Sequence, residues 1–269
     1  MRVAESADDL VARLAPFAQQ PARSVVVLDF DGSLAPIVDD PPSAAPLPGA
    51  VAVLGRLVRR AGRVAVVSGR PVEFLRAMVP VDGLMLFGQY GVERLDGTTV
   101  VTDPRARSWS KAVEAAAAEA GAALPGLFVE HKGAVAVALH WRRAPHLGAA
   151  ALDLGHRLAT THGLRLERGR LALELRAPVD VDKGTTTAAL AAGAHAALVA
   201  GDDRGDLAAF AALARLVDEG RVAHALRVAV RSPESPGELL RRADHTVDGP
   251  AGLVALLGAV ADVLDPGSR

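Results

Sequence analysis

The chain has 269 residues, half of them apolar but only 3% aromatic, so alanine, valine and leucine must fill most of its core. Its formal net charge of −1 provides no basic stripe for nucleic acid, and it has no cysteine for disulfides or cysteine-ligated metals. The acidic N-terminal segment lacks the apolar core of a secretory signal, and no apolar run is long enough to span a membrane. We therefore expect a cytoplasmic protein that binds neither nucleic acid nor membrane and has no obligate protein partner.

Short apolar strands alternate with helices in the first part of the chain. The helical spacing and the apolar runs predict helices over 7–20, 47–60 and 71–78 and strands over 24–29, 64–67 and 84–87. The same rhythm returns near the end, with helices over 183–192, 204–216 and 250–263 and strands over 196–200, 226–230 and 244–247. This alternation predicts a parallel sheet with helices on both faces.

The middle of the chain has a different pattern. It predicts helices over 110–120 and 146–161, each followed by a pair of strands, over 127–130 and 134–140 and over 164–167 and 171–175. An α-β-β-α-β-β unit of this kind is typical of a small sheet backed by two helices. We therefore predict an α/β fold with a doubly wound parallel-sheet core over 1–102 and 178–269, interrupted by an inserted α+β domain over 103–177.

Carboxylates follow two of the predicted core strands. Asp29 and Asp31 stand where the first strand runs into a glycine turn, and Asp202, Asp203 and Asp206 follow the strand over 196–200. A turn stabilised by an aspartate side chain explains one such residue. It does not explain why the same pattern occurs at both ends of the chain.

A hydroxyl and a cation accompany these acids. Ser68 and Gly69 follow the second strand, and Lys183 opens a helix. Sites in α/β proteins gather at the carboxyl ends of parallel strands, so we expect these groups to converge with the acids. Any one of these short motifs alone is weak evidence, whereas their presence in this order favours a shared site.

The residue types favour metal-assisted phosphoryl chemistry. Mg²⁺ prefers hard oxygen ligands, which the carboxylates of Asp29 and Asp202 and the carbonyl of Asp31 supply. With the phosphate held by the metal, by Lys183 and by Ser68, Asp29 can attack phosphorus and form an aspartyl-phosphate. Asp31 can then protonate the leaving alkoxide and later activate water.

The four motifs together resemble those of the haloacid-dehalogenase (HAD) superfamily of phosphatases: Asp29-x-Asp31-Gly-Ser-Leu, Ser68-Gly69-Arg70, Lys183-Gly184 and Gly201-Asp-Asp-x-x-Asp206. The resemblance implies that Asp29 is the nucleophile and Asp31 the acid/base. It implies that Ser68, Gly69 and Lys183 bind phosphate, and that Asp203 and Asp206 support the metal. The inserted domain lies where the larger type of HAD cap is found.

A narrower resemblance covers nearly the whole chain and is to the trehalose-6-phosphate phosphatase family. The segments that carry it are Gly88-Gln-Tyr-Gly-Val-Glu93, Glu130-His-Lys132, His140-Trp-Arg142 and Glu174-Leu-Arg176-Ala-Pro178, the last followed by Lys183-Gly184. It implies a Mg²⁺-dependent phosphoric monoester hydrolase acting on a sugar phosphate. It also implies a set of substrate-binding residues: Gln89, Glu130, Lys132, His140, Arg142, Glu174 and Arg176.

The chain departs from the family pattern at four positions. Tyr90 replaces a histidine, Asp182 an asparagine, Gly205 a threonine and Leu207 a glutamate. None of these changes removes the nucleophile, the acid, a metal ligand or the lysine. They leave open related substrates, such as sucrose phosphate, mannosyl-phosphoglycerate or validoxylamine 7′-phosphate.

Three other interpretations remain open. A receiver-like signalling module also combines an acidic Mg²⁺ pocket with a lysine, although it needs no inserted domain. A phosphomutase shares the chemistry but returns the phosphoryl group to a sugar. In the inserted domain, Glu130 and Lys132 share one strand face, and an exposed cross-strand ion pair would explain them without any ligand.

Overall fold

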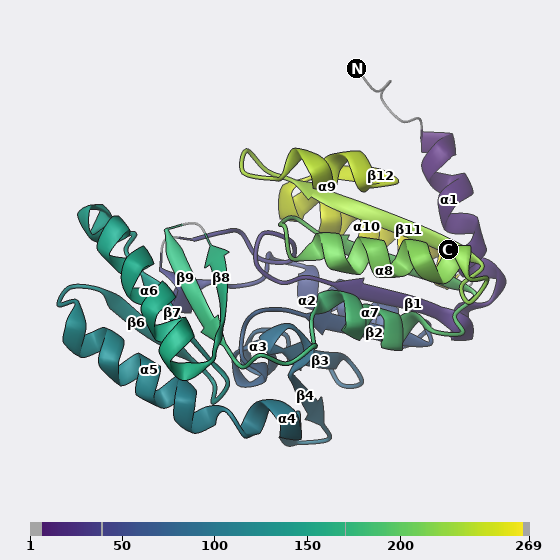
Figure 1. Ribbon diagram of the computed structural model, residues 1–269. Helices are drawn as coiled ribbons and strands as arrows, with labels where there is room; N and C mark the ends of the chain where they lie inside the picture. Colours follow the sequence, from purple (N-terminus) through teal and green to yellow (C-terminus); the bar gives the residue numbers. More distant parts are fainter. Residues whose placement is uncertain (1–6, 39, 170, 266–269) are drawn as a thin grey trace. The chain divides into compact units, whose positions relative to one another are not determined.

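The computed structural model describes residues 7–38, 40–169 and 171–265 (Figure 1). The chain forms two compact units, one made of residues 1–91 and 181–269 and the other of residues 92–180. The predicted insertion spans 103–177, so the second unit begins earlier along the chain than the inserted domain expected from sequence. The N-terminal residues 1–6, which carried part of the argument against a secretory signal, lie outside the described residues.

The first unit is built on a parallel sheet. Among the described residues, the strands of this unit lie in the order β12-β11-β10-β1-β2-β3, and every neighbouring pair of them is parallel. Their bounds are β1 Ser24–Leu28, β2 Arg63–Val67, β3 Met85–Gly88, β10 Ala196–Gly201, β11 His224–Arg231 and β12 His245–Asp248. Every residue of β1 and β10 is buried, as expected for central strands covered on both faces. The predicted doubly wound core is thus confirmed.

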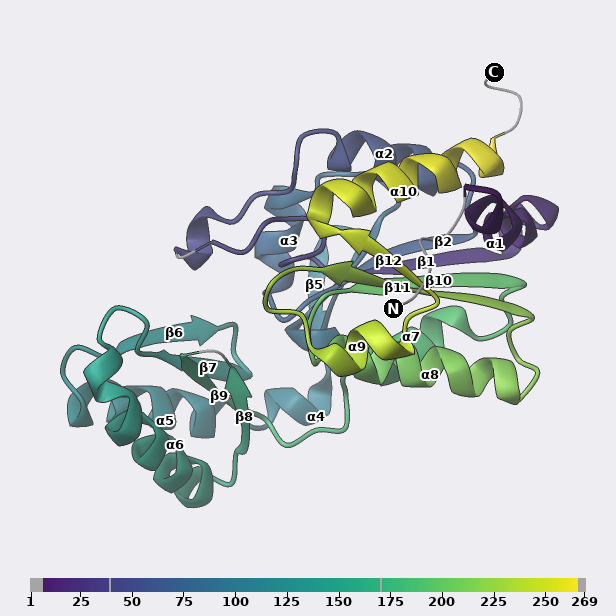
Figure 2. The same cartoon turned by 90° about the horizontal axis from the view of Figure 1, so that it is seen from above.

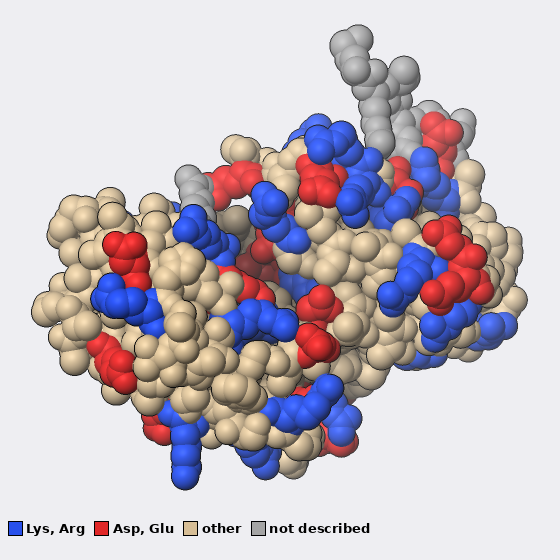
Figure 3. All heavy atoms as spheres, in the orientation of Figure 1, with Lys and Arg blue, Asp and Glu red and all other residues tan. Residues whose placement is uncertain are grey.

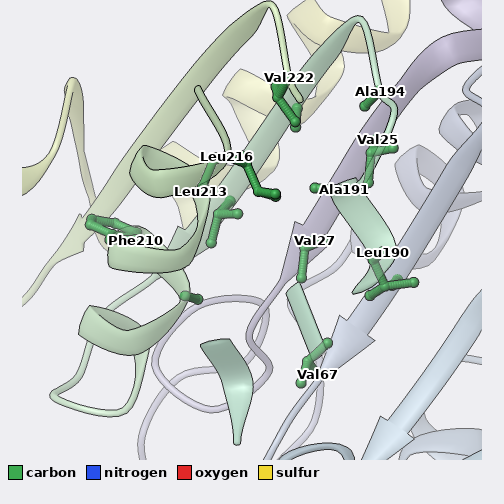
Figure 4. Close-up of a cluster of buried hydrophobic side chains, with 14 of the residues drawn as sticks. Val25, Val27, Val67, Leu190, Ala191, Ala194, Phe210, Leu213, Leu216 and Val222 are labelled. Atoms are coloured by element: carbon green, nitrogen blue, oxygen red, sulfur yellow. The ribbon is translucent and has the colours of Figure 1, made fainter. Parts of the chain in front are cut away.

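Helices cover both faces of this sheet, as Figure 2 shows for α7 and α8 on one side and α2 and α10 on the other. The helices of this unit are α1 Ala7–Gln19, α2 Ala50–Val58, α3 Val72–Met78, α7 Lys183–Ala191, α8 Asp206–Asp218, α9 Gly237–Arg242 and α10 Gly249–Leu264. On the α7/α8 face, Val25 and Val27 of β1 pack in one cluster with Leu190, Phe210 and Leu213 (Figure 4). This packing fixes where the first turns of α7 and α8 begin.

One predicted helix start is wrong. The spacing placed Leu47 at the beginning of the second helix, with Pro48 in its first turn, but α2 begins at Ala50. Gly49 has a φ of 88°, in the left-handed region that favours glycine, so the chain turns there before the helix starts.

The second unit has its own sheet and core. Strands β6 Phe128–Lys132, β7 Ala136–His140, β8 Arg165–Gly169 and β9 Ala172–Arg176 form an antiparallel sheet in the order β6-β7-β9-β8. Helices α5 Ser110–Ala123 and α6 Gly148–His162 pack on one face of it, against Val137, Leu139, Leu173 and Leu175. The α-β-β-α-β-β pattern predicted for this part is confirmed.

The sequence interpretation missed a hairpin at the start of this unit. Strands β4 Glu93–Asp96 and β5 Thr99–Thr102 pair antiparallel, and helix α4 Pro104–Arg107 follows them. The two-residue turn between Asp96 and Thr99 opens on Gly97, whose φ of 59° lies in the region that favours glycine and that such hairpin turns require. The short helix α9 was also not predicted.

The described helices include none that combines the length and the apolar character needed to cross a bilayer. On the face shown in Figure 3, basic and acidic side chains are interspersed.

Candidate active site

Neighbouring strands of the first unit bring the predicted acids together. Because β1 and β10 are parallel and paired from Ser24↔Ala196 to Leu28↔Ala200, they end at the same edge of the sheet. Asp29 follows β1, with its amide donating to the carbonyl of Ala200 at 3.0 Å, and Asp202 follows β10. Oxygens of Asp29, Asp202 and Asp206 lie within 4.8 Å of one another. The convergence expected from sequence is therefore present.

Lys183 lies in contact with this acidic cluster. Its Nζ is 2.7 Å from Asp29 Oδ1 and 2.7 Å from Asp206 Oδ1, and 3.9 Å from Asp203 Oδ1. The lysine is the first residue of α7, whose N-cap is Asp182. Asp182 accepts from the amide of Thr185 at 2.7 Å, a capping contact that asparagine makes equally well, so this departure from the family motif conserves the helix start.

Asp206 organises the loop that carries Asp202. Its Oδ2 accepts from the backbone amides of Asp202 at 3.0 Å and Asp203 at 3.1 Å, while its Oδ1 accepts from Lys183. Both oxygens of Asp206 are thus engaged within the protein. A Cβ at Gly201 would lie 2.0 Å from Asp206 Cγ, so only glycine allows the carboxylate to close this loop.

Burial shifts the pKa values of the acids in this cluster. Burial raises the pKa of Asp29 and of Asp206 well above the usual value despite the nearby lysine. Burial, reinforced by Asp206 and Asp203, raises the pKa of Asp202 to about 7. Burial alone would lower the pKa of Lys183, but Asp206 and Asp29 outweigh it and raise that pKa. Several acids around one ammonium group thus leave an excess of negative charge that a cation would offset.

The donor atoms fit a divalent metal ion. Carboxylate oxygens are the hard ligands that such ions prefer, and the oxygens of Asp29 and Asp202 lie close enough to share one ion. The Asp202 side chain also accepts a hydrogen bond from Ser33 Oγ at 3.4 Å. Asp206 already uses both oxygens in hydrogen bonds, which suits a supporting role rather than direct ligation.

Ser68 and Gly69 lie beyond the end of β2, the other neighbour of β1. Ser68 is 1% exposed, and its backbone is tied to β3 through a 3.0 Å hydrogen bond from its amide to the carbonyl of Phe87. A Cβ at Gly69 would lie 2.7 Å from the hydroxyl of Tyr90, so the tyrosine that replaces the family histidine packs directly on this loop.

Arg70 holds the predicted acid/base. Its Nε donates to Asp31 Oδ2 at 2.8 Å and its terminal nitrogen to Asp31 Oδ1 at 2.7 Å, a bidentate pair. The guanidinium also donates to the carbonyl of Pro41 at 2.9 Å and lies 4.6 Å from the ring centre of Phe74. Arg70 belongs to the Ser-Gly-Arg motif, but the sequence interpretation gave it no role.

Gln89 is placed in a strained and buried corner. It is 1% exposed, and among the described residues neither polar atom of its side-chain amide has a hydrogen-bond partner. Gln89 and Tyr90 have φ values of 51° and 61°, which side-chain-bearing residues seldom adopt. Two buried unpaired amide atoms are costly, so they are consistent with a ligand contact. The predicted substrate role of Gln89 stays a prediction.

The predicted sugar-binding residues of the second unit share one face of its sheet. Opposed residues in antiparallel strands lie on the same side, and the pairings place Glu130, Ala138, Glu174 and Glu167 in one row and Lys132, Ala136, Arg176 and Arg165 in the next. The helices cover the other side. We call this the open face. Alanines 136 and 138 in its central strand leave room for longer side chains to meet above them.

Charged pairs connect the open face. Lys132 Nζ is 2.8 Å from Glu174 Oε2, across the alanines of β7 rather than between adjacent strands. Arg176 donates to both oxygens of Glu167 at 3.0 Å, and Glu167 is a participant that the sequence interpretation missed. Glu174 Oε1 is buried 3.7 Å from Arg176 Nε and has no hydrogen-bond partner among the described residues, so it can still accept from a hydroxyl group.

His140 and Arg142 have different settings. His140 ends β7, and its Nε2 is 2.8 Å from Glu130 Oε2. Arg142 lies beyond the strand, in the turn that follows Trp141. The structure therefore joins His140 to the row of predicted sugar-binding residues, while Arg142 lies outside the sheet.

Comparison with known proteins adds independent information. A family model described as trehalose-phosphatase matches residues 27–244. The trehalose-phosphate phosphatase of Mycobacterium avium is 34% identical over 254 residues, covering 90% of this chain and 63% of that protein. The one from Mycobacterium leprae is 39% identical over 189 residues, covering 66% of this chain and 40% of the relative. The chain thus spans less than two thirds of the length of these relatives.

Solved structures share the fold. The C-terminal domain of trehalose-6-phosphate phosphatase from C. albicans matches with a TM-score of 0.75 and 23% identity, covering 93% of this chain and 96% of that one. An Aspergillus fumigatus trehalose-6-phosphate phosphatase matches with a TM-score of 0.63 and 25% identity, covering 93% and 97%. A haloacid dehalogenase-like hydrolase from Bacteroides thetaiotaomicron matches with a TM-score of 0.63 and 13% identity.

Proposed function

This chain belongs to the trehalose-phosphatase family, and from that premise we propose that it hydrolyses trehalose 6-phosphate to trehalose and inorganic phosphate. The observation that carries the proposal is the contact between Lys183 and Asp29, whose charged atoms lie 2.7 Å apart in a buried site. A cation that binds phosphate therefore lies beside the carboxylate that attacks it. Asp202 and Asp206 complete the cluster.

We propose that Mg²⁺ is the metal of this site. Asp29 and Asp202 would hold it through carboxylate oxygens and Asp31 through its carbonyl, with Asp203 and Asp206 supporting them. When bound, the ion neutralises negative charge on the acids and on the phosphate. Octahedral magnesium keeps several water ligands, which is compatible with so few protein oxygens.

The first chemical step transfers the phosphoryl group to Asp29. An oxygen of Asp29 forms a bond to phosphorus as the bond between phosphorus and the sugar oxygen breaks. Asp31 donates a proton to that departing oxygen, so trehalose leaves as a neutral alcohol. Lys183, Ser68 and the backbone at Gly69 hold the phosphoryl oxygens during the transfer, which depends mainly on positioning and charge.

The second step releases phosphate. Asp31, now ionised, takes a proton from a water molecule that attacks phosphorus, and the bond to Asp29 breaks to restore the carboxylate. Both steps need the Asp31 carboxyl group, yet its two oxygens are occupied by Arg70 in this structure. We therefore expect Asp31 to exchange Arg70 for substrate during the reaction.

The second unit would act as the cap domain that recognises the sugar. Glu130, Lys132 and Glu174 present charged donors and acceptors on the open face, and such groups discriminate strongly between hydroxyl patterns. His140 and Arg176 hold Glu130 and Glu167 in place, and Gln89 and Arg142 complete the predicted set.

The substrate assignment is tested by measuring phosphate release from a panel of esters with Mg²⁺ present. Trehalose 6-phosphate should give the highest kcat/KM, ahead of sucrose 6-phosphate, glucose 6-phosphate and p-nitrophenyl phosphate. A higher value for another sugar phosphate would replace the proposed substrate. An isomerised sugar phosphate without free phosphate would indicate a mutase instead.

A change on the open face should affect only the natural substrate. Replacing Glu174 with glutamine removes the charged acceptor, and we expect kcat/KM for trehalose 6-phosphate to fall by roughly tenfold or more. Activity on p-nitrophenyl phosphate should be little changed, because that ester has no sugar hydroxyls. Glu119→Gln, the same substitution on an exposed position of α5, is the control. Equal losses on both esters would contradict this division of roles.

Magnesium should also stabilise the folded protein. A cation that binds only the folded state raises the midpoint of thermal unfolding, and Asp202→Asn should lose most of that rise. Without metal, the pKa of Asp202 is about 7 in the folded protein against about 4 in the unfolded chain. The carboxyl group therefore ionises more readily in the unfolded chain, and the free energy of unfolding falls as pH rises from about 4 to about 7. The metal-free variant should therefore match the wild type in acid and exceed its stability at neutral pH. Thermal scans across pH, with and without Mg²⁺, measure both effects.

A further inference from the structure

Phe128 is an exposed aromatic residue on a sheet face that carries several charged side chains. It opens β6, and its side chain is 47% exposed, whereas Val137, Leu139, Leu173 and Leu175 of the same sheet are fully buried. The pairing Phe128↔His140 places it on the open face, the side that the helices do not cover. Its ring is thus presented beside the predicted sugar-binding residues.

His140 connects Phe128 to the charged row. The two rings lie 5.6 Å apart between centres with an angle of 37°, and His140 Nε2 is 2.8 Å from Glu130 Oε2. The imidazole thus contacts an apolar ring on one side and a carboxylate on the other. These contacts hold the ring of Phe128, the imidazole of His140 and the carboxylate of Glu130 next to one another on the open face.

The neighbouring positions leave space above the sheet. His140 pairs with Ala172, and Glu130 pairs with Ala138, so small residues flank the aromatic ring on the adjoining strands. Two strands further across lies Glu174, whose Oε1 is 3.7 Å from Arg176 Nε and has no hydrogen-bond partner in the part of the chain that the structure describes. Two strand spacings amount to about 10 Å, a span comparable with a disaccharide.

A pyranose ring suits this combination. One of its faces presents C–H groups and its edge presents hydroxyls, so it can lie against an aromatic plane while carboxylates accept from the hydroxyls. Ligand sites commonly join an aromatic wall with a few placed polar groups in this way. A phosphate group, which is charged and has no apolar face, gains nothing from Phe128.

We propose that Phe128 is a specificity-determining residue that stacks on a glucose ring of the substrate, with His140 fixing its position beside Glu130. This inference rests on the proposed function, since it assumes a sugar phosphate as substrate. It extends that proposal by assigning apolar contact, in addition to hydroxyl recognition, to the open face. The proposed stacking contributes to substrate binding only, so the rate at which bound substrate is hydrolysed does not depend on it.

Saturation-transfer NMR tests the contact directly. Trehalose is added to the 269-residue chain, aromatic protons are irradiated, and the signal passed to the sugar C–H protons is recorded. We expect transfer in the wild type, an apparent affinity for trehalose that is roughly three- to tenfold weaker in Phe128→Leu when the transfer is titrated, and its recovery in Phe128→Tyr, which keeps the flat ring. Val11→Ala, at a 64% exposed apolar position of α1, should behave as the wild type. An apparent affinity for trehalose that is unchanged in Phe128→Leu would overturn the proposal.

Kinetics separate this inference from the proposed function. In Phe128→Leu, KM for trehalose 6-phosphate should rise roughly three- to tenfold with little change in kcat, and Phe128→Tyr should restore it. If the wild type hydrolyses trehalose 6-phosphate and Phe128→Leu has the same KM, the stacking proposal fails alone. If the wild type binds trehalose through Phe128 but releases no phosphate from its 6-phosphate, the proposed reaction fails and the contact stands.

Discussion

Replacing Asp29 with asparagine should abolish turnover of every phosphate ester, with a loss on the order of 10⁴-fold or more. The amide is isosteric with the carboxylate but lacks the anionic oxygen that, in the proposed mechanism, bonds to phosphorus. We expect no other acid to take its place, because Asp206 uses both oxygens within the loop and Asp202 follows the adjacent strand β10. The loss should appear in single-turnover experiments with trehalose 6-phosphate and with p-nitrophenyl phosphate alike.

Two measurements distinguish loss of the nucleophile from loss of the fold. Mass spectrometry of acid-quenched protein should detect a phosphorylated chain in the wild type and none in Asp29→Asn. The midpoint of thermal unfolding should be retained, because the substitution removes a carboxylate whose ionisation burial already opposes. Asp82→Asn, at an exposed position, is the matched control. Appreciable residual turnover in Asp29→Asn would show that another group attacks phosphorus.

Replacing Lys183 with methionine should destabilise the protein by about 3–5 kcal/mol. The ammonium group is the cation in contact with both Asp29 and Asp206, each at 2.7 Å, and all three side chains are buried. Methionine keeps the length of the side chain but leaves these carboxylates without a counter-charge. Urea denaturation measures the effect as a lower midpoint with an unchanged slope.

Lys111→Met provides the control for this measurement, since Lys111 is exposed on α5. It should leave the urea midpoint unchanged. An equal midpoint for Lys183→Met and the wild type would show that the acids do not depend on the lysine. Where Lys183→Met retains enough folded protein for assay, activity should be lost on all esters, because we propose that the same ammonium group holds the phosphate.

The catalytic cluster was predictable because parallel strands impose a simple rule. Asp29 and Asp202 each follow an apolar run, and such strands end at one edge of a sheet, so their approach follows from the alternation of strands and helices. Contacts that depend on the length and conformation of side chains could not be predicted from such a rule. The pairing of Arg70 with Asp31 depends on the turn after β1 and on how a long guanidinium group folds back.

The open face illustrates the same limit. Period-two spacing placed Glu130 and Lys132 on one side of a strand, and that was correct. An exposed cross-strand pair had been the simpler explanation, but Lys132 instead reaches Glu174 across β7, which depends on small residues in the strand between them. The order β6-β7-β9-β8 is needed to see this, and strand order is not encoded in local periodicity.

Two glycines of the first unit have a consequence for how relatives are classified. A Cβ at Gly32 would lie 2.1 Å from Asp202 Oδ2, and a Cβ at Gly201 would lie 2.0 Å from Asp206 Cγ. An alanine at either place would displace an acid while every reactive side chain remained in the sequence. A homologue scored only on its acids and lysine would then pass for a working phosphatase although it was a pseudoenzyme, so surveys of this family should inspect both glycines.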